Sequence, residues 1–391
     1  MNILWVSPFL PSHDAPHAGG RAVAQWIAAA AARHSVTLLT RVEPPERGAA
    51  EALRASLAAV HVQEFGRPAE GTLSMARIVA SYVRLGRAAN RLVSAGRFDL
   101  LHVEFLETGL AIDAARTVPR IAVAHDELTK PARHRLGLAR GARRLGAWAY
   151  WRAVERLQRR ICRKFDRVLT MSEHDRRTLL ASDPRLSVGI LPPPISIDPA
   201  KVVAPARDAA GLLFVGAMYR DANADAMSWF CEAILPRVRA AVPDAALTIV
   251  GADPTEHVRG LAARPGVSVT GFVDVIEPCY ARAAVFVAPL RIAGGVAGKT
   301  RDAMAAGCAV VTTRAGNVGL DATPGVHLLV GDTPEEFAAA VTRLLRDPAL
   351  RRRLGEEGRR FSVERYGPGV AAAALEREQQ AVAGAPAVTR R

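Results

Sequence analysis

The feature that most constrains the fold of this chain is a regular alternation of short apolar runs with helix-length segments. Helical patterns such as those at 21–34 and 72–96 separate the runs. Strands that alternate with helices are typical of β-α-β units and a parallel sheet. The first half therefore predicts a doubly wound α/β domain, with strands at 3–8, 36–40, 60–65, 99–105, 120–126 and 167–172.

The alternation stops at 191–211 and then begins again. This break reads LPPPISIDPAKVVAPARDAAG, and its prolines and small residues interrupt every periodic pattern. A length of 391 residues also suits two domains of ordinary size. We therefore expect two doubly wound Rossmann-like domains that face each other across a cleft. The strand patterns of the second domain lie at 212–217, 246–251, 267–272, 284–290, 308–313 and 327–331.

Positive charge is concentrated in the first half of the chain. Residues 1–207 hold 31 Lys and Arg against 18 Asp and Glu. Residues 130–167 alone hold thirteen basic and two acidic residues, interleaved with apolar residues that include Trp148, Tyr150 and Trp151. This pattern is typical of a basic amphipathic helix that contacts anionic lipid headgroups. A nucleic-acid-binding helix and a solvated arginine-rich face are the alternatives.

The cysteines and the apolar runs indicate the compartment. The four cysteines, at 162, 231, 279 and 308, have no C-x-x-C spacing, which argues against a zinc site and a disulfide framework. No segment keeps the roughly 18 uninterrupted apolar residues that a membrane-spanning helix needs. We therefore expect a cytoplasmic protein that is at most peripheral at the inner face of the membrane.

A glycine-rich loop follows the strand pattern at 284–290. It reads RIAGGVAGKTRDAMAAG over 291–307 and places Gly294 and Gly295 ahead of Lys299 at the start of a helix. Adjacent glycines let backbone N–H groups approach a ligand, and the lysine and the helix N-terminus favour an anion. The loop lacks the spacing of a dinucleotide fingerprint or a P-loop. It predicts a phosphate site, with a plain strand-to-helix turn as the alternative.

Taken in order, the motifs of the second half resemble the donor domain of family 4 GT-B glycosyltransferases, the group 1 glycosyltransferases. These motifs are FVGAMYRDANADAMSWF, LTIVG, VTGFV, APLRIAGGVAGKTRDAMAAGCAVVTTRAGNVGL and RLLRDPALRRRLGEEGRRFSVERY. The first half agrees through the glycine pair after its first strand, HD after its fifth strand and SEHDRRTLL before the break. The resemblance therefore spans essentially the whole chain.

The resemblance implies an activity and a division of labour. Residues 1–205 are expected to bind the acceptor and residues 206–391 a nucleotide-diphosphate sugar, with the last helix, at about 366–385, packing back on the first domain. The implied reaction transfers the sugar with retention of anomeric configuration. No D-x-D pair occurs, so neither a metal nor a cofactor is expected. The acceptor is expected to be a lipid-linked glycan or a natural product, and no nucleic acid is expected as a partner.

The resemblance also implies two catalytic residues. Lys299 matches the basic residue on the donor diphosphate, where it would stabilise the leaving group as its charge grows. His125 matches the histidine that faces the donor sugar across the cleft, and a strand-end histidine with ordinary hydrogen bonds is its alternative. The neighbouring Asp126 could instead be a helix N-cap.

Further residues are implied to contact the donor. Phe272 and Val273 lie beside the base, and Asp302 stands where the family usually has a glutamate on the ribose. Gly294 replaces another family glutamate, so backbone amides are expected to meet the sugar hydroxyls. The full set of implied donor contacts is Gly19, Gly20, Gly216, Arg220, Phe272, Val273, Gly294, Gly295, Val296, Lys299 and Asp302.

Two rival functions fit the same resemblance. The replacements at Gly294 and Asp302 suit a non-catalytic relative that only binds a nucleotide. A GT-B sugar-nucleotide epimerase shares the architecture, but the loop at 291–302 lacks the second carboxylate that such an enzyme would need.

Overall fold

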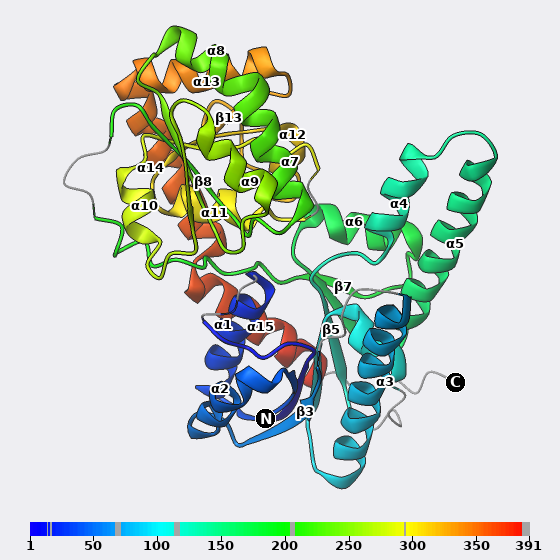
Figure 1. Ribbon diagram of the computed structural model, residues 1–391. Coiled ribbons are helices and arrows are strands. Elements are labelled where there is room, and N and C mark those ends of the chain that lie inside the picture. Colours follow the sequence, from blue (N-terminus) through cyan, green and yellow to red (C-terminus); the bar gives the residue numbers. More distant parts are fainter. Residues whose placement is uncertain are drawn as a thin grey trace. The chain divides into compact units, whose positions relative to one another are not determined.

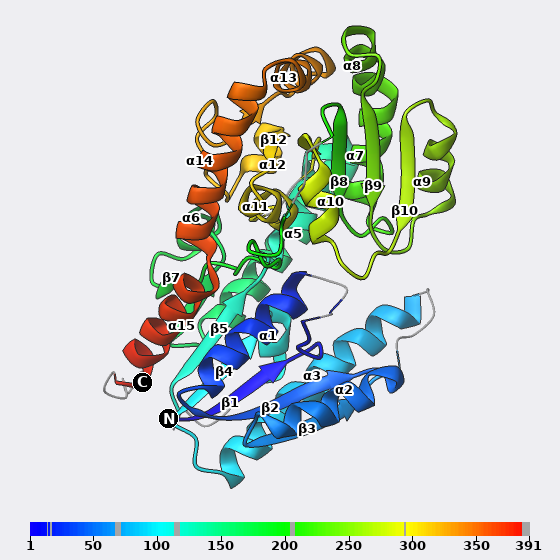
Figure 2. The ribbon, with the colours of Figure 1, turned by 90° about the vertical axis from the view of Figure 1, so that its left-hand side faces the viewer.

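The computed structural model describes residues 1–13, 15, 18–66, 72–112, 118–203, 208–292 and 295–384. The chain divides into two compact units, each around its own sheet (Figures 1 and 2). Unit 1 comprises Met1–Pro192 and Ala371–Arg391, and unit 2 comprises Pro193–Val370. The two units are described separately.

The sheet of unit 1 is entirely parallel. Its strands are β1 (Asn2–Ser7), β2 (Ser35–Val42), β3 (Ala59–Glu64), β4 (Leu100–Glu104), β5 (Arg120–Ala124), β6 (Arg167–Thr170) and β7 (Val188–Ile190). Their order across the sheet is β3-β2-β1-β4-β5-β6-β7. The six predicted strands are confirmed with small shifts of their ends. Sequence patterns missed β7, because three residues ahead of a proline run show no period.

Helices cover both faces of this sheet. They are α1 (Ala18–Ala31), α2 (Arg47–Ala52), α3 (Thr72–Ala95), α4 (Thr129–Leu138), α5 (Ala142–Cys162), α6 (Glu173–Ser182) and α15 (Pro368–Ala383), with 3-10 turns η1 (Pro44–Glu46), η2 (Leu53–Ala55) and η3 (Leu106–Ala111). Figure 1 shows α1, α2 and α15 on one face and α3 and α5 on the other. Leu85 of α3 and Ile161 of α5 share one buried cluster with strand residues such as Val103.

The C-terminal helix α15 packs on unit 1 through polar and apolar contacts. Glu378 accepts two hydrogen bonds from the guanidinium of Arg167, at 2.7 and 3.1 Å. The His34 ring lies 2.8 Å from a carboxylate oxygen of Glu376. Ala371 and Leu375 are buried beside them. A segment more than 170 residues beyond the rest of unit 1 thus completes this unit.

The basic segment at 130–167 is two helices, which corrects the prediction of one amphipathic helix. The helix α4 ends at Leu138, and α5 begins at Ala142. Between them Gly141 has a φ of 56°, which ends the helical run. The two helices pack against each other as a hairpin (Figure 1). Exposed apolar side chains are carried near its turn and along α5: Leu138, Leu145, Trp148 and Tyr150.

Unit 2 repeats the architecture around a parallel sheet. Its strands are β8 (Gly211–Val215), β9 (Ala246–Val250), β10 (Val267–Gly271), β11 (Val285–Ala288), β12 (Ala309–Thr312) and β13 (Leu329–Val330). They lie in the order β10-β9-β8-β11-β12-β13. All six predicted strands are confirmed, and so is the predicted fold class of two doubly wound parallel sheets.

The helices of unit 2 enclose a large apolar core. They are α7 (Asp221–Trp229), α8 (Leu235–Ala241), α9 (Glu256–Gly260), α10 (Glu277–Arg282), α11 (Gly298–Ala305), α12 (Arg314–Asn317), α13 (Pro334–Arg346) and α14 (Pro348–Tyr366), with a π-helical turn η4 (Phe230–Ile234) and a 3-10 turn η5 (Leu261–Ala263). The core includes Phe214, Phe230, Phe286 and Phe337. No helix in the described part of the chain has the length and hydropathy that crossing a lipid bilayer requires.

Candidate functional site

Both sheets have a strand order that reverses direction at a defined point. In such doubly wound sheets, ligands bind outside the carboxyl ends of the strands at this switch point. The switch lies between β1 and β4 in unit 1 and between β8 and β11 in unit 2. Gly216 and Lys299 follow β8 and β11, and His125 follows β5, next to β4. The predicted catalytic residues therefore lie at or beside the switch point of each sheet.

Lys299, in the first turn of α11, has only neutral partners. Its ammonium donates a hydrogen bond to Oδ1 of Asn223 and lies 5.0 Å from the centre of the Phe214 ring. Within the described ranges, no carboxylate forms an ion pair with it. Burial, and after it the charge of Arg220, lowers the pKa of Lys299 to about 7. The residue is still partly exposed, so an anion can reach it and restore its charge.

Asn223 is a site residue that the sequence analysis missed. It is buried on α7, and its Nδ2 donates to the carbonyl of Ala217 at 2.8 Å. That bond turns Oδ1 toward Lys299. The signal was present, because Asn223 lies at the start of the helix that follows β8, but asparagine is also common at such helix starts for capping alone.

Gly216 leaves the space that this arrangement needs. A Cβ atom at Gly216 would lie 2.8 Å from Nδ2 of Asn223 and 3.3 Å from Cε of Lys299. Contacts below 3.0 Å force a neighbour to move, and both neighbours belong to the site. The predicted contribution of Gly216 is thus given a steric reason.

Arg220 adds a second cation to the same region. It occupies the N-cap position of α7, is exposed, and is close enough for its charge to lower the pKa of Lys299. Among the residues that the structure describes, its guanidinium has no ion-pair partner. Arg220 and, below about pH 7, the ammonium of Lys299 thus place positive charge at this end of the sheet.

Asp302 has protein partners that the prediction did not include. Its Oδ1 accepts hydrogen bonds from Nε and Nη2 of Arg301, at 2.9 and 2.8 Å, and from the backbone N–H of Ser196 at 3.1 Å. Arg301 also donates to the Pro193 carbonyl at 2.9 Å. Asp302 therefore fixes the entry of the chain into unit 2, while Oδ2 makes no hydrogen bond within the described residues.

The remaining predicted donor contacts of unit 2 are distributed around this centre. Gly295 is buried with a φ of 68°, and Val296 is half-buried. Phe272 follows β10 with 71% of its surface exposed, whereas Val273 packs on the core. Gly294 lies outside the described residues.

The glycine pair of unit 1 lies inside a helix, which corrects the prediction that it precedes one. Gly19 and Gly20 belong to the first turn of α1. Glycine is tolerated there because the N–H groups of a first turn have no partner within the helix. Both residues still lie at the carboxyl end of the sheet, after β1.

His125 is fixed by a carboxylate and two aromatic rings. Its Nε2 lies 2.7 Å from Oε2 of Glu104. Its ring stacks on Phe105 with 3.8 Å between centroids and 7° between planes, and Trp26 meets it edge-on at 5.8 Å. Phe105 has a φ of 61°, a strained conformation for a residue with a side chain. Strain at this position indicates that the stacking is required by the surrounding structure.

Glu104 and His102 were missed by the sequence analysis. Both are completely buried, and Nε2 of His102 lies 3.2 Å from Oε1 of Glu104. Burial alone would raise the pKa of Glu104, but the hydrogen bonds from both imidazoles outweigh it and lower the pKa. The signal was the sequence H-x-E in a strand, since residues i and i+2 share a face.

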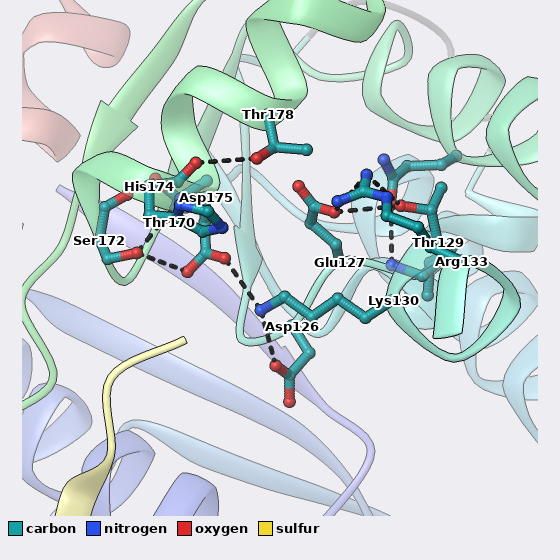
Figure 3. Close-up of polar contacts among 12 residues, drawn as sticks. Asp126, Glu127, Thr129, Lys130, Arg133, Thr170, Ser172, His174, Asp175 and Thr178 are labelled. Carbon is teal, nitrogen blue, oxygen red and sulfur yellow. Dashed lines mark hydrogen bonds and ion pairs between the residues drawn. The ribbon is translucent and has the colours of Figure 1, made fainter. Parts of the chain in front are cut away.

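A second polar cluster follows β5 and β6 (Figure 3). Lys130 lies between two carboxylates, 3.1 Å from Asp126 and 2.9 Å from Asp175. Burial alone would lower the pKa of Lys130, but the two carboxylates outweigh it and raise the pKa. Ser172 caps α6 and donates to Asp175 at 2.7 Å. The N-cap interpretation of Asp126 is wrong, because the N-cap residue of α4 is Leu128.

In the ranges that the structure describes, no group of three or more His, Cys, Asp and Glu side chains is arranged to hold a metal ion.

Comparisons with known proteins match both units. The family model "Glycosyl transferase 4-like domain" matches residues 18–193, and "Glycosyl transferases group 1" matches residues 209–347. A search of curated proteins finds no match.

Several solved structures have the same fold. Sucrose-phosphate synthase from Thermosynechococcus elongatus superposes with a TM-score of 0.73 at 17% identity, covering 98% of this chain and 100% of that one. HepE from Anabaena, solved with UDP and glucose, gives 0.67 at 13%, covering 96% and 98%. A glycosyltransferase from Rickettsia africae gives 0.66 at 10%, covering 97% and 98%. At these identities the likeness shows a shared fold.

Proposed function

Because the chain belongs to the group 1, GT4-like glycosyltransferases and has their GT-B fold, we propose that it transfers a sugar from a nucleotide-diphosphate sugar to an acceptor, with retention of configuration and without a metal ion. Family membership makes it a glycosyltransferase of EC class 2.4. In the proposal unit 2 binds the donor and unit 1 the acceptor.

The observation that carries the proposal is a half-buried lysine without an anionic partner among the described residues. Lys299 has a pKa of about 7 and lies near Arg220, in the first turn of the helix that follows the glycine-rich loop. A donor diphosphate supplies the missing negative charge and favours the charged ammonium. As the glycosidic bond breaks, charge grows on the leaving diphosphate, and a preorganised cation stabilises that state most.

The other residues of unit 2 contribute binding in this proposal. Oδ2 of Asp302 accepts from a ribose hydroxyl, and the exposed Phe272 ring packs beside the base. Backbone amides of Gly294, Gly295 and Val296 meet the sugar. From unit 1, His125 orients a hydroxyl of the donor sugar, and Gly19 and Gly20 also contact the donor.

Nucleotide binding tests the proposal directly. UDP, GDP, ADP and TDP are each added to the protein, with and without EDTA, and thermal unfolding is measured. A nucleotide at 100 times its Kd stabilises the folded state by about 2.7 kcal/mol. UDP is the first candidate, because HepE was solved with UDP and with UDP-glucose.

Two outcomes would overturn parts of the proposal. Indifference to all four nucleotides would refute donor binding, and loss of binding in EDTA would refute metal independence. NMR of the product, once an acceptor is found, reports whether configuration is retained. Nucleotide binding without release of nucleoside diphosphate from any donor would instead favour the non-catalytic alternative.

The hairpin of α4 and α5 supports a membrane surface as a partner of unit 1. Leu145 and Trp148 are exposed on the arginine-rich helix α5, and Arg135 of α4 stacks on Tyr150 of α5 at 5.8 Å, which joins the two helices. Each arginine near an anionic bilayer contributes about 1 kcal/mol, and interfacial tryptophan adds apolar anchoring. The proposed acceptor is then a lipid-linked glycan presented at the membrane, rather than a soluble natural product.

Vesicle sedimentation distinguishes the two acceptors. We expect binding to phosphatidylcholine vesicles that contain phosphatidylglycerol, weaker binding in high salt, and none after Arg143→Glu with Arg144→Glu. Arg352→Glu with Arg353→Glu on α14 is the matched control, because it makes the same charge change on an exposed pair in unit 2. Equal recovery in the supernatant with neutral and anionic vesicles would contradict the membrane proposal.

A further inference from the structure

Four side chains from three segments of unit 1 form a continuous buried chain of hydrogen bonds that ends at His125. Gln379 of α15 donates from Nε2 to Nδ1 of His102 at 3.3 Å. His102 therefore carries its hydrogen on Nε2, from which it donates to Oε1 of Glu104 at 3.2 Å. Nε2 of His125 donates to the other oxygen, Oε2, at 2.7 Å. Because the ionised Glu104 carboxylate can only accept, both imidazoles carry a hydrogen on Nε2.

We propose that Glu104 is a positioning residue that holds His125 as the tautomer with its hydrogen on Nε2, leaving Nδ1 to meet the donor sugar. His102 and Gln379 hold Glu104 in place. This inference rests on the proposed function, because it gives His125 a substrate to meet. Nδ1 of His125 has no hydrogen-bond partner among the described residues, as the proposal requires.

The packing around the chain leaves Glu104 as the group that selects the tautomer. Phe105 and Trp26 set the plane of the His125 ring but make no hydrogen bond to it. Trp5 stacks on His102 at 3.8 Å and holds that ring in the same way. Of the nearby charged groups, Glu107 on η3 interacts with His125 only through space. Glu104 alone, within the described residues, bonds to the ring.

A carboxylate at position 104 indicates a specific role, because burying its charge costs free energy. Glu104 is completely buried, and a buried charge contributes little to stability when an apolar or amide group of similar size could replace it. A glutamine would fill the same volume. Only an ionised carboxylate, however, accepts from both imidazoles at once and so specifies both tautomers. The charge of Glu104 is therefore explained by its orientation of the two imidazole rings, because an uncharged side chain would pack equally well.

Glu104→Gln tests the proposal, with Glu378→Gln as the matched control. Both variants change Glu to Gln in unit 1. Glu378 is next to Gln379 in the sequence, but its carboxylate bonds to Arg167 and takes no part in the hydrogen bonds that lead to His125. The readouts are kcat for transfer, Kd for UDP, and the ring carbon and nitrogen shifts of His125 in histidine-labelled protein, which distinguish the two tautomers. The His125 signal is assigned by its loss in His125→Gln.

We expect Glu104→Gln to lower kcat by about ten- to a hundredfold while Kd for UDP stays unchanged, as is typical when a group that orients a functional histidine is lost. The His125 shifts should move toward the other tautomer, because the carboxylate that accepts from Nε2 is gone. Glu378→Gln should leave kcat and the shifts as they are.

A second variant keeps the test decisive if Glu104→Gln does not fold. Gln379→Met keeps the side-chain length on α15 and removes only the hydrogen bond between Gln379 and His102. The His125 shifts should therefore move in the same direction as in Glu104→Gln, with a smaller loss of kcat. Unchanged His125 shifts in the folded variants would overturn the proposal, even if kcat fell. If His125→Gln keeps full activity or UDP does not bind, the proposed function fails instead, and the shifts still report on the tautomer.

Discussion

The two sheets have the same strand order except for the additional edge strand β7 of unit 1, but their electrostatics at the switch points are opposite. In unit 2, Lys299 is a cation whose partners are neutral, and its pKa is depressed to about 7. In unit 1, Glu104 is a buried anion that two imidazoles already satisfy, and its pKa is lowered. The first site has no anionic partner among the described residues, whereas the carboxylate of the second is paired within the protein. In the proposed function, the first site binds the donor and the second orients His125.

Removing the cation of unit 2 should have the largest effect. We expect Lys299→Met to slow transfer by about 10²–10³, because one preorganised group that stabilises the leaving charge is lost. Steady-state kinetics with the donor identified by thermal shift checks this. Lys201→Met removes an exposed lysine of the same unit and should leave the rate unchanged. A variant at position 299 with wild-type turnover would remove the contrast between the two sites.

The depressed pKa of Lys299 makes donor binding depend on pH. Above pH 7 the empty site holds a neutral lysine, which must take up a proton when the diphosphate binds. We therefore expect Kd for UDP to rise by about tenfold per pH unit above 7, measured by calorimetry in buffers of different ionisation enthalpy. Lys299→Met should show no such slope, and a constant Kd in the wild type would contradict the assignment.

The same pKa predicts a trend in stability. The folded-state pKa of about 7 lies below the ordinary 10.5, so the unfolded chain binds more protons between these values. The free energy of unfolding contributed by this site therefore rises as pH increases from 7 to 10.5. Denaturant titrations across this range should show the rise in the wild type and its absence in Lys299→Met.

Adding a methyl group to the site of unit 2 should weaken UDP binding, with a smaller effect than the loss of Lys299 has on transfer. The added methyl of Gly216→Ala would lie 2.8 Å from Nδ2 of Asn223, so Asn223 and Lys299 must shift. Overpacking of this kind costs about 1–3 kcal/mol, which corresponds to roughly 5- to 150-fold in Kd for UDP. Gly260→Ala is the control, since its Cβ meets nothing within 4 Å. Equal Kd values for the two variants would show that the loop adapts.

Asp302→Asn should have the smallest effect on catalysis. The amide oxygen can still accept from Arg301 and Ser196, while the charged acceptor for the ribose is lost. We expect a rise in KM of roughly fivefold, or about 1 kcal/mol, with kcat unchanged, because a ribose contact is equal in the ground and transition states. Asp225→Asn, in a surface pair with Arg291, is the control. A fall in kcat at constant KM would give Asp302 another role.

The sequence predicted the sites unevenly. Lys299 could be found because a glycine-rich loop, a lysine and a helix start are adjacent in the chain, and local geometry puts them together. Asn223 could not be singled out from the sequence, because its place in the site depends on a hydrogen bond with Lys299, which is 76 residues away. The hairpin of α4 and α5 was found as a basic segment, but its two-helix form depends on the backbone at Gly141. Sequence patterns thus located the regions that hold the candidate sites, but they did not determine which side chains contact one another there.

By itself, the sequence determined the two doubly wound sheets, because strand and helix periods depend on residues a few positions apart and repeat along the whole chain. It also determined the character of the loop around Lys299. Only the tertiary structure decided which groups meet: Glu104 with His125 across 21 residues, and Gln379 with His102 across 277. Such contacts depend on how distant segments pack, and burial then sets their charge states, so no local pattern specifies them.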